Sequence, residues 1–183
     1  GYSGNINIIS SLNQPYKKYS KSILFAKNGE LKKSLTILNE LIDSNRSNYF
    51  LLETKADILH SYGYTNESIK FYKKVLQKYK NNKYAQIRIF HSIDLNLLNK
   101  QELNQKFNEN YNLLTSYFFN KKMLTKYLIL SKQLERKDWI NFLNYWLNEE
   151  KKDINSVKVN LLEFKKTDNK QLYNLINLIY KEL

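Results

Sequence analysis

Cysteine is absent from this chain, which has only one proline and four glycines in 183 residues. The missing cysteines exclude disulfides and thiol chemistry, although they do not assign a cellular compartment. Neither glycine nor proline occurs from Thr65 to Leu183, whereas a β-rich domain needs such turn residues about every 8–12 residues. Helices joined by Asn, Asp and Lys turns need none of them. The sequence therefore predicts an all-α protein.

The motifs of enzymes are also missing. The internal glycines are isolated, so no glycine-rich loop is available to hold a phosphate group. His60 and His91 do not stand in an HExxH helix, and no cysteine is present to complete a zinc site. Glu53 and Asp57 are spaced i, i+4 and share a helix face, where an acid–base pair or weak cation site competes with a plain acidic surface patch. We predict no catalytic, cofactor or metal site, and no enzyme.

Long apolar segments are missing as well. No run approaches the roughly 18 apolar residues of a membrane-spanning helix, so we predict no membrane span. The chain starts at Gly1 without a signal-peptide pattern. Residues 1–15 are predicted to be an N-terminal tail or the remnant of a trimmed end.

Positive charge is in large excess, because 30 Lys and Arg against 17 Asp and Glu give a net charge of +13. Only Arg46, Arg88 and Arg136 are arginines, although arginine is the residue that recognises phosphate in a planar, bidentate way. The charge therefore indicates either a solvated surface shaped by A/T-rich codons or a surface that attracts nucleic acid over long range. The best candidate surface is a basic patch on one predicted helix and its following turn, formed by Lys70, Lys73, Lys74, Lys78, Lys80 and Lys83.

A repeat of 34 residues is the clearest internal pattern. A shift of 34 aligns Gly29 with Gly63, small residues with small residues, and apolar residues with apolar residues. Antiparallel helices approach closely only where small side chains face each other, and glycine can take the left-handed conformation that ends a helix. The other aligned pairs are Ser22 and Ala56, Leu24 and Ile58, Phe25 and Leu59, Ser34 and Ser68, Leu35 and Ile69, Ile37 and Phe71, Leu38 and Tyr72, Leu41 and Val75, and Ile42 and Leu76.

This pattern resembles the tetratricopeptide (TPR) family, whose repeat length is 34. The resemblance implies antiparallel helix hairpins that stack into a superhelix of about eight or nine helices. The clear repeats span about 15–48 and 49–82, and residues 83–183 are predicted to form divergent helical repeats and a cap, beginning with a helix at about 83–99. Residues 16–183 are thus predicted to form a single domain.

Within the TPR family, the segment 20–93 is similar to the C-terminal repeat domain of bacterial periplasmic zinc metalloproteases. The similarity is carried by Gly29-Glu30-Leu31, Asn48-Tyr49-Phe50 and Glu53-Thr54-Lys55-Ala56. In those enzymes the repeat domain docks protein clients or assembly machinery. Because the HExxH segment is absent, the resemblance implies a detached accessory domain without activity of its own. It also implies a periplasmic location; without it, a cytoplasmic one is expected.

The TPR resemblance also implies where a partner binds. The first helix of each hairpin, the A helix, lines a concave groove in TPR stacks. Chaperone-binding members place Lys and Asn in that groove to clamp a C-terminal carboxylate, whereas this chain has Tyr19, Ile23, Glu53 and Asp57 there. We therefore reject a chaperone-tail clamp and expect a peptide or helix with apolar anchors and some basic character. The predicted groove residues are Tyr16, Tyr19, Glu53, Asp57, His60, Tyr84, Arg88 and His91, together with Ile23 and Ile87.

Three functions are compatible with the sequence. The leading prediction is a non-catalytic scaffold that binds a partner protein or peptide in the groove. The alternatives are a basic helical-repeat protein that binds nucleic acid, and the client-docking accessory domain described above. The aromatic residues fall mostly at helical core spacing, and Trp139 and Trp146, seven residues apart, are predicted to pack helix on helix.

Overall fold

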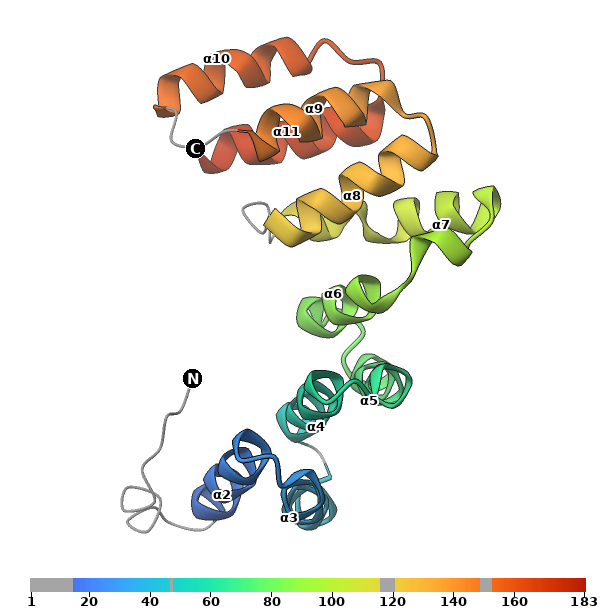
Figure 1. Ribbon diagram of the computed structural model, residues 1–183. Helices are drawn as coiled ribbons and strands as arrows, with labels where there is room; N and C mark the ends of the chain where they lie inside the picture. The colour runs from blue at the N-terminus through green and yellow to red at the C-terminus, as the bar shows by residue number, and fades with distance from the viewer. Residues whose placement is uncertain (1–14, 47, 116–120, 149–152) are drawn as a thin grey trace. The chain divides into compact units, whose positions relative to one another are not determined.

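The computed structural model describes residues 15–46, 48–115, 121–148 and 153–183. Over these residues the chain is helical, with ten α-helices, two short 3-10 helices and no strand (Figure 1). The predicted all-α class is confirmed. The α-helices are α2 (Tyr16–Lys27), α3 (Leu31–Ser44), α4 (Tyr49–Ser61), α5 (Thr65–Lys78), α6 (Lys83–Ser92), α7 (Lys100–Asn110), α8 (Lys121–Gln133), α9 (Lys137–Leu147), α10 (Ile154–Phe164) and α11 (Lys170–Glu182), and the 3-10 helices are η1 (Leu95–Leu97) and η2 (Tyr111–Thr115).

The helix count of the described residues, ten, exceeds the eight or nine predicted. One boundary error is clear, because the helix predicted over 83–99 ends at Ser92. The Asp94 side chain then accepts a hydrogen bond from the Asn96 N–H (3.0 Å) and starts η1. Asn99 and Glu102 form a reciprocal capping box that starts α7. These polar caps separate the helices without glycine or proline. The sequence prediction relied on those two residues to mark helix ends, so it extended the helix to residue 99.

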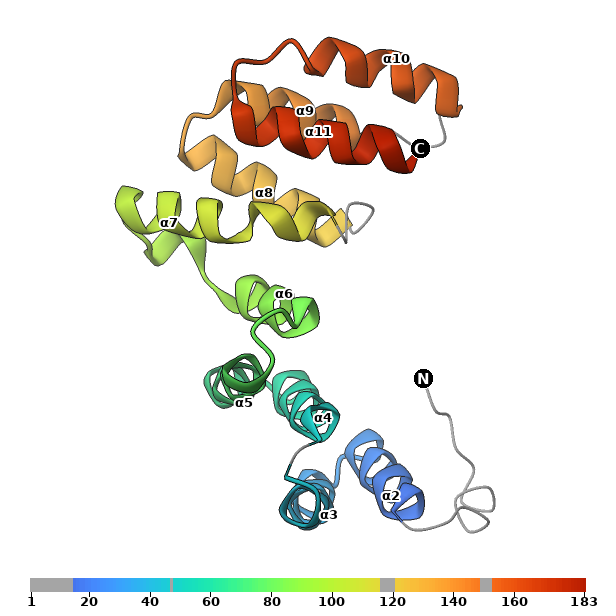
Figure 2. The ribbon, with the colours of Figure 1, turned by 180° about the vertical axis from the view of Figure 1, so that it is seen from behind.

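The chain divides into two compact units, Gly1–Ser92 and Ile93–Leu183. The N-terminal unit contains α2 to α6, and the C-terminal unit contains η1 to α11 (Figure 2). The boundary follows α6, which the sequence assigns to the start of the divergent repeats. The single domain over 16–183 stays a prediction.

The two hairpins of the N-terminal unit, α2–α3 and α4–α5, turn in the same way. Gly29 and Gly63 both have a φ of 83°, the left-handed conformation that the sequence predicts. In each turn the next N–H reaches back five residues, from Glu30 to the Phe25 carbonyl (2.8 Å) and from Tyr64 to the Leu59 carbonyl (2.9 Å). No neighbouring atom lies within 4 Å of where a Cβ would stand. Glycine is therefore required at these positions because of the positive φ, since a side chain would have room there.

Small residues stand at the contact between the helices of each hairpin. Ser22, Ser34, Ala56 and Ser68 all have no exposed surface. In the first hairpin the hydroxyls of Ser22 and Ser34 form a hydrogen bond of 3.2 Å. In the second hairpin Ala56 replaces the first serine, and the Ser68 hydroxyl has no hydrogen-bond partner among the described residues. The close approach is thus repeated after 34 residues, but the hydrogen bond is not.

The core of the N-terminal unit has two clusters of buried apolar side chains. The first cluster joins the first hairpin to α4, and the second joins α4 and α5 to α6. Because each cluster draws on more than one hairpin, neither hairpin covers its own apolar stripe. The buried residues are Leu38, Leu41, Leu51 and Ile58 in the first cluster and Ala56, Tyr72, Val75 and Ala85 in the second.

Aromatic packing dominates the core of the C-terminal unit. The ring of Phe107 from α7 lies 5.2 Å from Tyr127 of α8 and 4.9 Å from Trp139 of α9, measured between centroids. The Arg136 guanidinium covers the same ring at 3.9 Å. Trp139 and Trp146 are both buried. The structure therefore gives both tryptophans the packing role that their spacing predicts.

The two serine sites lead to a prediction about stability. Ser34→Ala removes the hydrogen-bond partner of Ser22, so we expect the free energy of unfolding to fall by about 1 kcal/mol. Ser68→Ala removes a buried hydroxyl that has no partner, so we expect it to rise by about 1 kcal/mol. Urea unfolding followed by circular dichroism measures both. Effects of the same sign at these two equivalent positions would contradict the assignment of the hydrogen bonds.

Candidate partner-binding site

The helices α2, α4 and α6, which hold the predicted groove residues, are joined by side-chain contacts within the N-terminal unit. The Tyr19 hydroxyl of α2 lies 3.3 Å from the Thr54 hydroxyl of α4. The Tyr84 hydroxyl of α6 donates to Asp57 of α4 at 2.7 Å. Because these contacts join α2 to α4 and α4 to α6, the predicted groove residues come from neighbouring helices.

Asp57 is the centre of a polar group that we call the inner cluster, formed by Glu53, Asp57, Tyr72, Asn82, Tyr84 and Arg88. Its Oδ1 accepts a hydrogen bond from the Tyr72 hydroxyl of α5 and lies 3.1 Å from Arg88 Nη2 of α6. Its Oδ2 accepts from Tyr84. Arg88 Nε in turn donates to the Tyr72 hydroxyl at 3.0 Å. One carboxylate therefore connects three helices.

The protonation states of the inner cluster follow from its burial and its hydrogen bonds. Burial and the hydrogen bond to Asp57 raise the pKa of Tyr72 and of Tyr84, so both phenols stay protonated and donate. Burial by itself lowers the pKa of Arg88, but Tyr72, Asp57 and Tyr84 outweigh it and raise that pKa. The guanidinium also lies 5.9 Å from the ring centroids of both tyrosines. Arg88 thus remains a cation paired with Asp57.

Glu53 stands one helical turn before Asp57 and is only 9% exposed. Its Oε1 accepts a hydrogen bond of 2.5 Å from the Asn82 amide in the turn between α5 and α6. Burial raises the pKa of Glu53, the Asn82 hydrogen bond lowers it, and the neighbouring Asp57 charge raises it, with a net increase. The two carboxylates are therefore not an open acidic patch, since Asp57 has partners from α5 and α6 and Glu53 has one from the turn between them.

The sequence prediction named four members of the inner cluster and missed Tyr72 and Asn82. Tyr72 belongs to a B helix, the second of its hairpin, and takes the apolar core position of Leu38 in the preceding repeat. The preceding repeat has a leucine at this position, whereas Tyr72 adds a hydroxyl. That difference in the sequence could have indicated that Tyr72 has a polar partner. Asn82 also caps its own turn, because its Oδ1 accepts from the Ala85 N–H at 2.9 Å.

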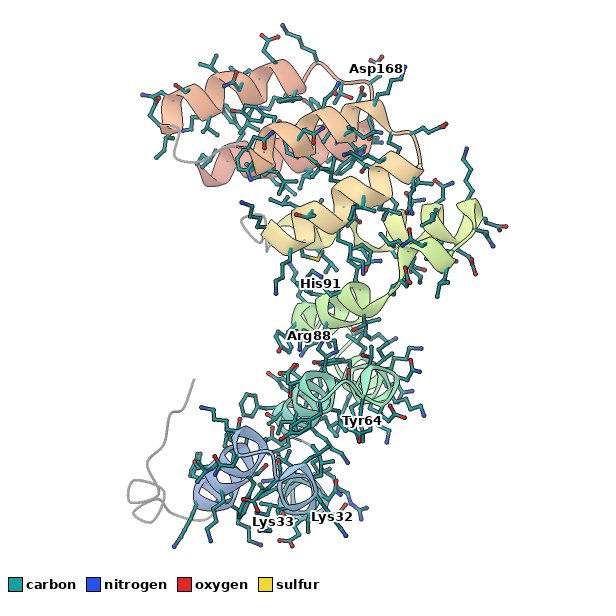
Figure 3. All side chains as sticks on the ribbon, viewed as in Figure 1. Lys32, Lys33, Tyr64, Arg88, His91 and Asp168 are labelled. Carbon is teal, nitrogen blue, oxygen red and sulfur yellow. The ribbon has the colours of Figure 1, made fainter. Side chains whose placement is uncertain are left out.

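The other predicted groove residues of α4 and α6 are partly covered. His60 follows Asp57 along α4 and is half-buried, and its Nδ1 has no hydrogen-bond partner among the described residues. His91 lies half-buried near the end of α6, and Figure 3 labels it with Arg88. Ile87 is buried, and Ile23 packs against the first apolar cluster. The two isoleucines thus belong to the core more than to an open surface.

Tyr16 and Tyr19 line a cavity of about 330 Å³ where the start of α2 and the turn between α3 and α4 meet. The Tyr19 and Phe50 rings lie 5.6 Å apart, and Tyr16 remains 67% exposed. The sequence prediction missed the residues that α3 and the start of α4 contribute. The lining consists of Pro15, Tyr16, Tyr19, Ser20, Leu41, Asn45, Asn48, Phe50 and Leu51.

The predicted basic patch is exposed. Its lysines lie on α5, in the turn that follows and at the first residue of α6, and all six of them, Lys70, Lys73, Lys74, Lys78, Lys80 and Lys83, are exposed. The ammonium of Lys74 lies 5.0 Å from the Phe71 ring centroid, and Lys55 of α4 covers the same ring at 4.2 Å. Burial and the charge of Lys74 lower the pKa of Lys55. Lys55 thus extends the patch beyond the segment that the sequence indicates.

Within 15–46, 48–115, 121–148 and 153–183, no group of three or more His, Asp or Glu side chains is arranged to hold a metal ion. In the same part of the chain, no helix combines the length and the apolar character that crossing a membrane requires.

No protein-family model matches this chain, and neither the curated proteins nor the solved structures contain a match.

The inner cluster predicts a measurable coupling between Tyr84 and Asp57. Tyr84→Phe deletes the hydroxyl that donates to the carboxylate, so we expect the free energy of unfolding to fall by about 1 kcal/mol. In an Asp57→Ala background the same substitution should have little effect, because its acceptor is already gone. A double-mutant cycle by urea unfolding measures this coupling. Equal losses in both backgrounds would show that the hydrogen bond contributes nothing.

The raised pKa of Glu53 predicts that the free energy of unfolding depends on pH. Its pKa is higher in the folded chain than in the unfolded chain, so stability is lost as pH rises from the unfolded value of 4.5 through the folded one. Glu53→Gln keeps an acceptor for Asn82 and abolishes the titration. We expect the variant to gain stability relative to the parent at pH 7.5 but not at pH 4, measured by urea unfolding at both values. A difference that does not change with pH would contradict the assigned direction of the pKa shift.

Proposed function

We propose that the chain is a non-catalytic, TPR-like scaffold that binds a partner protein or peptide over the A helices α2, α4 and α6. The observation that carries this proposal is the cavity beside Tyr16 and Tyr19. It lies at the end of the face where the TPR resemblance implies partner contacts. An apolar side chain of the partner enters this cavity and anchors the complex.

The chemistry of the cavity favours an aliphatic or aromatic side chain. Apolar surface comes from Leu41, Leu51, Phe50 and the tyrosine rings. The polar side-chain groups of the lining are those of Ser20, Asn45 and Asn48 and the tyrosine hydroxyls. Burial of a side chain the size of Leu or Phe contributes about 1.5–3 kcal/mol, which corresponds to roughly 10- to 150-fold in affinity. An amphipathic helix or extended segment with one such anchor is the partner that fits.

The inner cluster favours a basic residue next to the anchor. Asp57 is compensated by Arg88, whereas Glu53 is paired only with a neutral amide. Phe50 at the cavity and Glu53 are three residues apart on α4 and thus share a face. Glu53 is therefore a carboxylate whose hydrogen-bond partner among the described residues is neutral, in a chain with a net charge of +13. This is consistent with a partner that has some basic character.

Peptide display tests the proposal. Random 12-residue peptides selected on the 183-residue chain should share a Leu, Phe or Trp anchor. Ser20→Leu adds a branched side chain to the cavity lining and should weaken the selected peptides at least about tenfold, because the anchor loses its site. Tyr64→Ala is the matched control, since Tyr64 is 49% exposed but lies at the turn before α5. Isothermal titration calorimetry measures both affinities, and circular dichroism verifies folding.

Two results would overturn this proposal. The first is equal binding to the parent and to folded Ser20→Leu. The second is tight binding of single-stranded RNA that falls steeply with salt, is lost in Lys70→Glu/Lys73→Glu and persists in Ser20→Leu. That pattern would assign the function to the basic patch and to nucleic acid.

A further inference from the structure

The outward side of α5 carries lysines and no large apolar side chain. Lys70, Lys73 and Lys74 are exposed and lie within about 100° of one another around the helix axis. The acid of this helix, Glu67, stands in its first turn. The three lysines make no ion pair with the described carboxylates. This side of α5 is thus a positive surface without an ion-pair partner in the part of the chain that the structure describes.

A fourth lysine joins this surface from α4. The ammonium groups of Lys55 and Lys74 lie 4.2 and 5.0 Å from the Phe71 ring centroid, so they are no more than about 9 Å apart. Lys55 Nζ donates to the neutral Asn39 amide oxygen at 2.6 Å. Burial and the charge of Lys74 lower the pKa of Lys55, and the Asp43 charge partly opposes them. A bound anion offsets the repulsion between the two lysines, so the pair favours a negatively charged ligand.

The spacing of these four lysines, which we call the lysine cluster, suits a chain of carboxylates. Lys70 and Lys74 are four residues apart on α5, which corresponds to a rise of about 6 Å. Alternate side chains of an extended peptide lie on one side of it and repeat about every 6.7 Å. Glu or Asp at alternate positions therefore reaches successive lysines. The members of the lysine cluster are Lys55, Lys70, Lys73 and Lys74.

The aromatic rings near the lysine cluster disfavour nucleic acid. Proteins that bind single strands without sequence preference use rings on which the bases stack. The Phe71 ring already has two ammonium groups over it, and the Tyr79 ring packs on Tyr49 at 4.5 Å. Arginine, the residue for bidentate recognition of phosphate, is absent from the cluster. A base would displace existing contacts in order to stack, whereas a carboxylate chain needs no ring.

An anionic membrane also fits this surface less well. Helices that lie on a lipid surface bury an apolar face in it beside their basic residues. None of the large exposed apolar side chains of the described residues belongs to α5. The lysine cluster therefore has the charge for a lipid headgroup but no side chain that would enter the bilayer.

We propose that the lysine cluster binds an acidic segment of a partner protein, with Glu or Asp at alternate positions of an extended chain. This site goes beyond the anchor cavity of the proposed function. It consists of α5 and Lys55, whereas the cavity is lined by α2, α3 and the start of α4. The two sites take opposite charges, so they bind different segments.

A fluorescein-labelled peptide of alternating Glu and Ser, with six of each, tests the proposal by fluorescence anisotropy in about 50 mM salt, where screening is weak. The same peptide with Gln in place of Glu should not bind. Lys70→Glu/Lys74→Glu replaces two attractions with two repulsions, so we expect the affinity to fall at least about tenfold. Ser20→Leu should leave it unchanged, because the cavity is a separate site.

Lys21→Glu/Lys32→Glu is the matched control, since it changes the net charge equally at exposed lysines of α2 and α3. We expect it to weaken the peptide less than about threefold, because long-range attraction alone is reduced. No binding to the parent, or equal losses in the two double variants, overturns the proposal. A uridine oligomer with six phosphates that binds more tightly than the peptide also overturns it, as do phosphatidylserine vesicles that retain the chain at a salt concentration where the peptide dissociates. Circular dichroism verifies that each variant folds.

Discussion

A left-handed residue followed by a hydrogen bond that spans five residues determines how this chain folds back on itself. Gly29 and Gly63 make this turn in the N-terminal unit. The α8–α9 turn of the C-terminal unit repeats it, since Glu135 has a φ of 56° and the Arg136 N–H donates to the Ser131 carbonyl at 3.0 Å. The turn places consecutive helices antiparallel and in contact, so the apolar stripe of each hairpin faces the next hairpin. The cavity and the inner cluster both arise where such hairpins meet.

The inner cluster and the cavity differ in what they offer to the proposed partner. The hydrogen-bonding capacity of Asp57 is largely occupied by Tyr72, Tyr84 and Arg88, so the cluster is a junction between helices more than an open receptor. The cavity has few polar groups and presents apolar surface to a side chain of the partner. Affinity should therefore come from the anchor, whereas the residual charge of Glu53 selects among partners that share such an anchor.

Much of the fold could be predicted from the sequence, and less of the site. The 34-residue repeat indicated the two left-handed glycines and the buried small residues, because these depend on local backbone geometry. The early end of α6 at Ser92 was missed, since Asp94 and Asn99 are common residues that cap only in context. The hydrogen bonds of Asp57 and the α3 side of the cavity depend on neighbours distant in sequence. Glu135 gave no signal either, because glutamate rarely adopts a positive φ.

The position of Tyr72 also limits how these repeats can be rearranged. The first repeat holds Leu38 at the equivalent place and makes only apolar contacts there, so it imposes no particular neighbour. The second repeat has a phenol whose hydroxyl needs Asp57 and the Arg88 of the helix that follows. A swap of the two repeats would leave that hydroxyl and that carboxylate without Arg88, and a duplication of the second repeat would do so in the first of its two copies. The hairpins look modular in their backbone, but the polar junction fixes their order along the chain.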